Sequence, residues 1–344
     1  MKIFYAVQAT GNGHISRAME ILPYLKQYGE VDIFLSGDYS SLEMEANVRY
    51  RSKGVCFRYN DTGRIAVGKT LYGLAPLRVF REARDLPVHR YDLVVNDFDF
   101  ITALACRIKK IPSINFGHHA SFQSAKVPRP EKRDRVGELI LTYFGRATQY
   151  LGLHFESYDD FILPPVIRKA VRQADPTDCG HTAVYLPAYS DEEIEKQLSR
   201  LDSRFEVFSR SLKQPLRKGN IQFLPVNRKS FTKSLMNCRS IIAGAGFETP
   251  AEALYLRKKM LVIPVQGQYE QQCNAAALKK LGVPVMSALK ELSPEAFAKW
   301  MGERKRIQLR SEFSTQAIVS HLMYCSRNQP AAELDLCYPE WVIA

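Results

Sequence analysis

A histidine and an arginine enter the first helical turn after the first strand-like run of the chain. The run KIFYAVQ (2–8) is followed by ATGNGHISR, in which Gly11 and Gly13 precede His14 and Arg17. Glycines allow a tight turn and the close approach of a ligand, and a helix start after a strand faces the ligand-binding edge of a parallel sheet. His14 and Arg17 could therefore meet an anion or a hydroxyl group. The alternative is an ordinary strand–helix turn in which His14 only caps the helix.

An aspartate at the end of a later strand could act together with this histidine. The run DLVVNDFDF (92–100) predicts a buried strand that carries Asp97 to its carboxyl end, on the same edge of the sheet as His14. A carboxylate there could hold the imidazole by its ring N–H, fix its tautomer and raise its basicity, as a hydroxyl-activating base requires. The alternatives are that Asp97 caps the following helix, or that Asp99 is the partner instead.

An anion site is predicted where a strand in the second half runs into a helix. The stretch IIAGAGFETPAEAL passes through Gly244, Gly246 and Phe247 into a helix that starts at Thr249-Pro250. The unpaired N–H groups of such a helix start can receive an anion. Glu252 lies one turn further along, and a carboxylate beside a phosphate site suits the diol of a ribose.

Two adjacent amide side chains follow the next strand. The segment QGQYEQQCNA offers Gln271 and Gln272, whose amides can both donate to and accept from sugar hydroxyls. The alternative is a solvent-facing polar helix start, which explains Glu270 better than it explains the paired glutamines.

These residues require two sheets whose carboxyl edges face each other. Strand-like runs alternate with helical patterns along both halves, which is typical of an α/β protein with parallel, doubly wound sheets. In the first half we expect strands at 2–8, 30–37, 54–60, 91–97 and 111–117, and helices at 14–28, 71–86 and 101–109. In the second half we expect strands at 181–188, 205–210, 220–226, 239–246 and 259–265, and helices at 190–201, 228–237, 249–257 and 269–281.

A proline-rich segment separates the two halves. Pro164, Pro165 and Pro176 suit a linker, because each fixes its own backbone and discourages helix in the residue before it. We therefore expect a first domain, a linker, a second domain and a tail, at residues 1–163, 164–178, 179–325 and 326–344.

Composition limits the classes of protein that fit. The 344 residues are 46% hydrophobic and 24% charged, and the seven cysteines never occur as C-x-x-C, so neither a disulfide framework nor a zinc site is indicated. The chain shows no bilayer-spanning run and no secretion signal, so a cytoplasmic protein is expected. The net charge of +12 favours anionic partners. Nucleic acid is not expected among them, because no helix-turn-helix, zinc-finger or aromatic RNA-binding pattern is present.

The combined motifs resemble those of the inverting GT-B glycosyltransferases, most closely the bacterial branch that includes the peptidoglycan GlcNAc transferase. The resemblance covers about residues 1–325 and is strongest at 11–17, 91–119 and 239–282. It implies two Rossmann-like domains facing across a cleft, with the acceptor on the first and a UDP-sugar donor mainly on the second. The UDP-sugar is then a substrate, and neither a cofactor nor a metal is expected.

The resemblance also implies a role for individual residues. His14 matches the catalytic base and Asp97 the acid that orients it, while Glu252 matches the ribose ligand. Also matched are the backbone at Phe223 and Leu224, the amides near Phe247, Glu248 and Thr249, and the sugar contacts Gln271 and Gln272. The expected donor site is completed by residues chosen from their type and position alone, which are Gly11, Gly13, Arg17, Gly244 and Gly246. The chain departs from the family pattern at Gly244-Ala245, where relatives often carry a basic or polar side chain, and Glu248 adds negative charge. Neutralising the diphosphate is therefore expected to rely on Arg17 or another cation.

Two other functions compete with this interpretation. The segment GRIAVGKT (63–70) matches the phosphate-loop pattern G-x-x-x-x-G-K-[ST], so a P-loop NTPase or kinase that uses Lys69 is an alternative. Its apolar interior and its late position in the domain argue against it. A non-catalytic nucleotide-sugar-binding protein is the other alternative, although such a protein would not need the His14–Asp97 pair.

The acceptor is expected on the first domain. His118 and His119 follow a strand toward the cleft and are the predicted acceptor contacts, the alternative being two histidines bonded within a loop. Downstream, basic residues precede an apolar helical face; they are Lys126, Arg129, Lys132, Arg133 and Arg135, followed by Leu139, Ile140, Tyr143 and Phe144. Basic charge beside an apolar face can hold a protein on an anionic membrane. We therefore expect a lipid-linked or cell-envelope acceptor at the inner membrane face, the alternative being an ordinary amphipathic helix.

Overall fold

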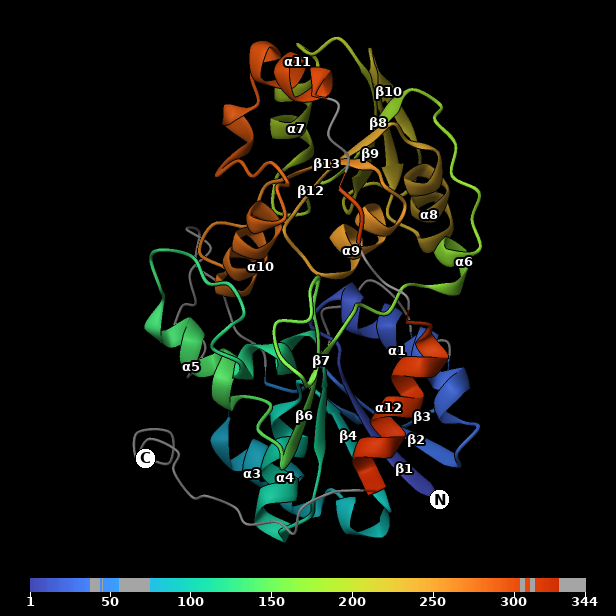
Figure 1. Ribbon diagram of the computed structural model, residues 1–344, viewed down its shortest axis with the longest axis vertical. Helices are drawn as coiled ribbons and strands as arrows, with labels where there is room; N and C mark the ends of the chain where they lie inside the picture. The colour runs from blue at the N-terminus through green and yellow to red at the C-terminus, as the bar shows by residue number, and fades with distance from the viewer. Residues whose placement is uncertain (38–43, 45, 56–74, 304–306, 310–312, 328–344) are drawn as a thin grey trace.

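The chain forms two sheets, one of parallel and one of mostly parallel strands, each with helices on its faces (Figure 1). The computed structural model describes residues 1–37, 44, 46–55, 75–303, 307–309 and 313–327. The predicted P-loop segment 63–70 lies outside the described residues, as do 56–60 of the predicted strand 54–60 and 71–74 of the predicted helix 71–86.

The first sheet has seven parallel strands in the order β3-β2-β1-β4-β5-β6-β7. Its strands are β1 (Lys2–Gln8), β2 (Glu30–Ser36), β3 (Val48–Ser52), β4 (Leu93–Asp97), β5 (Ile114–Gly117), β6 (Gln149–Leu153) and β7 (Ile162–Leu163). The helices that connect them are α1 (Asn12–Leu25), α3 (Pro76–Asp85), η1 (Val88–Arg90), α4 (Phe100–Lys109), η2 (His118–Gln123) and α5 (Arg135–Tyr143).

The second sheet has six strands in the order β10-β11-β9-β8-β12-β13, with only the β10–β11 pair antiparallel. Its strands are β8 (His181–Tyr185), β9 (Arg204–Ser209), β10 (Leu216–Lys218), β11 (Ile221–Pro225), β12 (Ser240–Ala243) and β13 (Lys259–Val262). Its helices are α6 (Lys169–Arg172), α7 (Asp191–Leu198), α8 (Arg228–Asn237), α9 (Glu248–Tyr255), α10 (Tyr269–Lys280), η3 (Leu289–Glu291) and α11 (Pro294–Gly302).

Alternation along the strands explains why both faces of each sheet are covered. In β1, Ile3 and Tyr5 pack into one apolar core while Phe4 and Ala6 pack into another, on the opposite face. A strand buried on both faces reads as a nearly continuous apolar run, as KIFYAV does. None of the described helices is long and apolar enough to span a membrane.

The last described helix, α12 (Thr315–Arg327), returns to the first domain. It packs on α1, where the Tyr28 and Ser320 hydroxyls lie 3.1 Å apart and the Thr315 hydroxyl donates to Glu20 at 3.4 Å (Figure 1). Its buried stripe, which includes Ile318 and Leu322, joins the core that contains α1. The structure thus differs from the predicted boundary, which assigned residues up to 325 to the second domain. The sequence shows the apolar stripe of α12 but not the surface that it covers.

The third strand of the first sheet also differs from the prediction. The sequence favoured residues 54–60, whereas β3 is Val48–Ser52 and pairs with β2. This edge strand is only half-buried in an alternating pattern, so VRYRS lacks the apolar run by which the inner strands were recognised.

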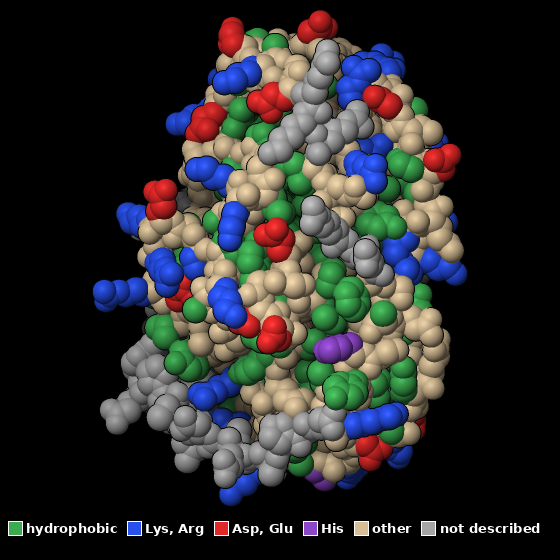
Figure 2. Space-filling view, viewed as in Figure 1, with side chains coloured by type: hydrophobic (Ala, Val, Ile, Leu, Met, Phe, Trp, Pro, Cys, Tyr) green, Lys and Arg blue, Asp and Glu red, His purple; other side chains and the backbone are tan. Residues whose placement is uncertain are grey.

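Charge is distributed over the molecule rather than concentrated. On the face shown in Figure 2, Lys and Arg side chains are interspersed with Asp and Glu over the upper part of the molecule. The net charge of +12 therefore does not reduce to a single basic patch on this face.

Candidate active site

The carboxyl ends of β1 and β4 bring His14 and Asp97 together. The two strands are parallel neighbours with Val7 opposite Asp97, and His14 lies in the first turn of α1. Nδ1 of His14 lies 2.9 Å from Oδ1 of Asp97, so the hydrogen bond expected from the sequence is present. Asp99 instead accepts from the Thr102 amide at 2.6 Å and caps α4. The structure therefore decides between the two aspartates.

This hydrogen bond determines which nitrogen of His14 can act as a base. Asp97 is ionised, so the proton on Nδ1 donates to it and Nε2 is left as the basic position. Burial opposes a charged imidazole, but the charge and hydrogen bond of Asp97 outweigh burial and raise the pKa of His14. Burial likewise opposes the Asp97 carboxylate, but Arg17 and His14 outweigh it and lower the pKa of Asp97 to about 2.

Arg17 is the third member of this cluster. Its Nη2 donates to both carboxylate oxygens of Asp97 at 2.8 Å, and its side chain is 3% exposed. Gly117 makes the close approach possible, since a Cβ there would lie 2.9 Å from Oδ1 of Asp97 and 3.1 Å from Nη2 of Arg17. Its φ of +138° is also one that a side chain disfavours.

Glu248 reaches this cluster from the second domain. It is the first residue of α9, and its carboxylate accepts a hydrogen bond from Nη1 of Arg17. The carboxylate also lies against Gly13, where a Cβ would overlap it. The sequence placed Glu248 among the donor residues, and the structure shows that it joins the two domains.

The predicted acceptor histidines are buried between the domains. The ring of His118 stacks on Phe247 of the second domain, with ring centres 3.9 Å apart, and its Nε2 lies 2.7 Å from Oδ1 of Asn274. Burial lowers the pKa of His118 to about 3, so its ring is neutral. The acceptor role of His118 stays a prediction, and the structure shows a neutral ring packed across the two domains.

His119 is packed against the proposed base. Its ring stacks on Phe98 at 3.8 Å and on His14 at 5.2 Å between ring centres. Phe98 has a φ of +57°, in the left-handed region that a bulky residue rarely adopts, and such strain is often found at functional sites. Nε2 of His119 lies 3.3 Å from Oε2 of Glu270. His119 therefore helps to fix the orientation of His14, while its predicted acceptor contact stays a prediction.

The predicted diphosphate residues lie at the start of α9. β12 ends at Ala243, and the backbone from Gly244 through Gly246 leads to Phe247 and into the helix. A Cβ at Gly246 would meet no heavy atom of a described residue within 4 Å, and the N-cap residue Phe247 forms no side-chain capping bond with the first turn. Thr249 belongs to this turn. An N-terminus of this kind, without a side-chain cap, can receive an anion.

Glu252 is engaged within the protein. Its two carboxylate oxygens accept from Nε and Nη2 of Arg168 at 2.6 Å each, and Nη1 of Arg168 donates to the Thr232 hydroxyl at 2.9 Å. Both side chains of the ion pair are buried. The predicted ribose contact would therefore have to use the remaining lone pairs of this carboxylate or break the ion pair.

The two predicted sugar amides differ in their surroundings. Oε1 of Gln271 accepts from the Val265 amide at 3.0 Å and so supports the loop before α10. Gln272 is half-buried, and its side chain forms no hydrogen bond with a described residue. Glu270 faces the first domain. Burial opposes its charge, but the nearby histidines, His119 above all, together outweigh burial and lower the pKa of Glu270 to about 2.

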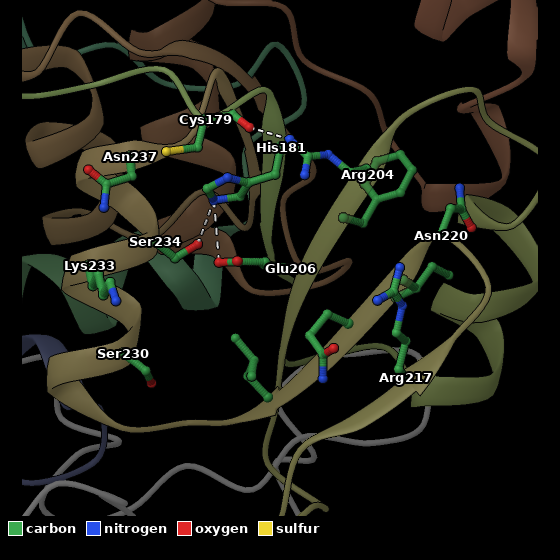
Figure 3. Close-up of a pocket in the computed structure, with 14 residues that line it drawn as sticks. Cys179, His181, Arg204, Glu206, Arg217, Asn220, Ser230, Lys233, Ser234 and Asn237 are labelled. Carbon is green, nitrogen blue, oxygen red and sulfur yellow. Dashed lines mark hydrogen bonds and ion pairs between the residues drawn. The ribbon is translucent and has the colours of Figure 1, made fainter.

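A cavity of about 490 Å³ lies between α8 and the strands β9 to β11 (Figure 3). Of the residues predicted to bind the donor only Leu224 lines it, while Phe223 is buried in the core. At its floor Nε2 of His181 lies 3.1 Å from the Ser234 hydroxyl and 3.3 Å from Glu206. Both partners share one ring nitrogen, which does not match a Ser-His-acid triad, where serine and acid take opposite nitrogens.

The sequence did not identify several residues that connect the domains. Besides Glu248, the contacts are His118 with Asn274, His119 with Glu270, Glu138 with Tyr269 at 2.5 Å, and the buried pair of the linker residue Arg168 with Glu252. Glu270 and Asn274 are four residues apart in α10, the helix after β13, so they lie on the same helix face. This spacing of two polar side chains is the signal by which the sequence could have identified them. Among the described residues no three His, Cys, Asp or Glu side chains are grouped as metal ligands.

Two Rossmann-like domains with their carboxyl edges in contact define the GT-B class of glycosyltransferases. Within that class, the model of glycosyl transferase family 1 matches residues 1–303, and the chain belongs to this family. No curated protein matches the sequence.

Solved structures share the fold at low sequence identity. A UDP-glucosyltransferase from Polygonum tinctorium capable of glucosylating indoxyl is 16% identical with a TM-score of 0.59, covering 95% of this chain and 93% of that chain. UGT89C1 from Arabidopsis thaliana, complexed with UDP, is 12% identical with a TM-score of 0.55, covering 95% and 94%. MurG from Acinetobacter baumannii is 13% identical with a TM-score of 0.52, covering 96% of each chain. The resemblance expected from the motifs is confirmed for the GT-B class, and in part for the peptidoglycan branch.

Proposed function

We propose that the protein transfers a hexose from a UDP-sugar to an acceptor hydroxyl with inversion at the anomeric carbon. The observation that carries the proposal is the hydrogen bond between His14 and Asp97, which leaves Nε2 of His14 as the basic position. The bond lies where the first domain contacts the start of α9, at Glu248. Family membership supports glycosyl transfer, and solved relatives with UDP support the choice of nucleotide.

The proposed step is a direct displacement. Nε2 of His14 takes the proton of the acceptor hydroxyl while its oxygen attacks the anomeric carbon. The bond from that carbon to the diphosphate oxygen breaks, and UDP leaves with the electron pair. Attack opposite the leaving group turns an α-linked donor into a β-glycoside. Asp97 stabilises the imidazolium that forms.

The donor contacts follow from the same arrangement. Backbone N–H groups of residues 247–249 and the guanidinium of Arg17 would offset the charge that grows on the diphosphate, so this proposal needs no metal. Glu252 would bind the ribose, Gln271 and Gln272 the sugar, and the backbone at 223–224 the base. The positions of these residues, within β11 and after β12 and β13, support the assignment.

A nucleotide-sugar panel tests the donor. UDP-sugars should raise the melting temperature of the protein, because a ligand at about 100 times its Kd stabilises the fold by about 2.7 kcal/mol. Sugars linked to ADP, GDP or TDP serve as controls, and release of UDP identifies the sugar that is transferred. Stabilisation by every nucleotide alike, or by none, would contradict the proposed donor.

A lipid-linked acceptor at the inner membrane face is the second part of the proposal. Two of the basic residues expected to serve it are already bonded: Lys126 pairs with Asp159 at 3.0 Å, and Nε of Arg129 donates to Glu138 at 2.9 Å. The apolar side of α5 packs partly inward, with Leu141 and Phe144 in the core. Exposed positions that support membrane contact are Lys132, Arg133 and Arg135 beside Val136, which is 42% exposed.

We expect the protein to sediment with anionic liposomes at low salt and to be released at high salt. Each basic residue near the surface contributes about 1 kcal/mol, which salt screens. Reversal of Lys132, Arg133 and Arg135 to Glu should abolish sedimentation, whereas reversal of the exposed Lys290 of the second domain should not. Absence of sedimentation at low salt would indicate a soluble acceptor.

A further inference from the structure

Glu248 places a negative charge where the proposed function requires an anion of the substrate. Its carboxylate lies at the N-terminus of α9, against Gly13 and on Nη1 of Arg17. These same groups, the helix N-terminus, the glycine turn and the guanidinium, are the ones assigned to the donor diphosphate. Helix N-termini favour carboxylates for the same reason that they favour phosphates.

The buried guanidinium of Arg17 donates hydrogen bonds to two carboxylates, one through each terminal nitrogen. Nη2 is taken by Asp97 at 2.8 Å, so Nη1 is the position that a further anion can use. Glu248 now fills it, although its own side chain is 26% exposed and lies on the other domain. Glu248 is therefore the member of this cluster that can leave toward solvent, whereas Asp97 is 1% exposed and cannot.

Glu248 and the donor diphosphate cannot both bind at Nη1 of Arg17, because both are negatively charged. With neutral His14, the group Arg17, Asp97 and Glu248 already has a net charge of −1. A diphosphate added beside it would face an uncompensated carboxylate, and like charges in an interface are costly. If Glu248 leaves when the diphosphate arrives, Nη1 of Arg17 binds one anion at a time: Glu248 without donor, and the diphosphate with donor.

We propose that Glu248 is an internal substitute for the donor diphosphate. Without donor, its carboxylate neutralises Arg17 and joins the two domains; the arriving diphosphate takes its place on Arg17 and on the amides of α9. This inference rests on the proposed function, because it assumes that the donor carries a diphosphate. It adds that donor affinity is limited by competition with a residue of the protein.

Calorimetry with inorganic pyrophosphate and with UDP tests the inference. Glu248→Gln keeps the size of the side chain and removes its charge, so both ligands should bind about tenfold more tightly, a difference of about 1.4 kcal/mol. The matched control is Glu295→Gln, which removes a first-turn glutamate from α11 and should leave both affinities unchanged. Melting temperatures of the variants show that they are folded.

The two proposals fail in different ways. Equal or weaker binding of pyrophosphate by Glu248→Gln, or no binding by either protein, overturns the role of Glu248. Tighter pyrophosphate binding without UDP binding would contradict the proposed donor and leave the role of Glu248 intact. Hydrogen exchange gives an independent measurement: without ligand, Glu248→Gln should speed amide exchange in residues 12–17, because the charged contact with Arg17 is lost. Unchanged exchange in the variant would show that Glu248 does not join the domains.

Discussion

Replacement of His14 by alanine is expected to lower kcat by about 10²–10⁴-fold, the usual loss when a general base is removed. Nε2 of His14 is the position left basic by the hydrogen bond of Nδ1 to Asp97. Without it, the acceptor hydroxyl must lose its proton to water while it attacks. The rate of UDP release, measured with saturating donor and acceptor, checks the prediction.

Donor binding separates a catalytic loss from a structural one. His14→Ala should bind UDP within about twofold of wild type, because a contact that acts only in the transition state leaves ground-state affinity in place. The matched control is His89→Ala, which removes an exposed histidine of η1 from the same domain and should leave kcat unchanged. Normal turnover in His14→Ala, with UDP binding intact, would refute the mechanism.

The inner strands and the helices that follow them could be predicted because burial leaves a local signal. Strands β1, β4, β8 and β12 are buried on both faces, and chemistry was expected at or just after the ends of β1, β4 and β12. Strands without that signal were not found: β3 alternates, and β7 has two residues. Helix α12 shows its apolar stripe, but its partner α1 is separated from it by about three hundred residues, and a local pattern cannot encode such a choice.

The same distinction applies to the site. The His14–Asp97 bond was predictable because neighbouring parallel strands place their carboxyl ends side by side. Contacts between domains were not, because they depend on how two separately folded edges meet. Glu252 illustrates this: its carboxylate was recognised one turn into α9, but its partner Arg168 lies in the linker, 84 residues away.

Replacement of Asp97 by asparagine is the second change with a large expected effect, again about 10²–10⁴-fold in kcat. Asparagine keeps the shape but removes the charge that stabilises imidazolium, and its amide can hold the ring in the wrong tautomer. Loss of the carboxylate also leaves the buried Arg17 with one ionic partner, so we expect the free energy of unfolding to fall by about 3 kcal/mol. Asp99→Asn is the matched control, because asparagine caps a helix about as well as aspartate and should leave kcat unchanged.

The pH dependence of kcat/KM shows whether Asp97 orients and charges His14 or only packs against it. His14 must be neutral to accept a proton, so kcat/KM should fall as the pH drops below its pKa, which Asp97 raises above the ordinary value. Asp97→Asn removes this raising effect, and the pKa of His14 then falls. The acidic limb of the kcat/KM profile should therefore move to lower pH in the variant, even though its maximum is lower. If Asp97 only packed the loop, the maximum would fall with the limb unmoved, and the assignment of Asp97 as the residue that orients the base would be wrong.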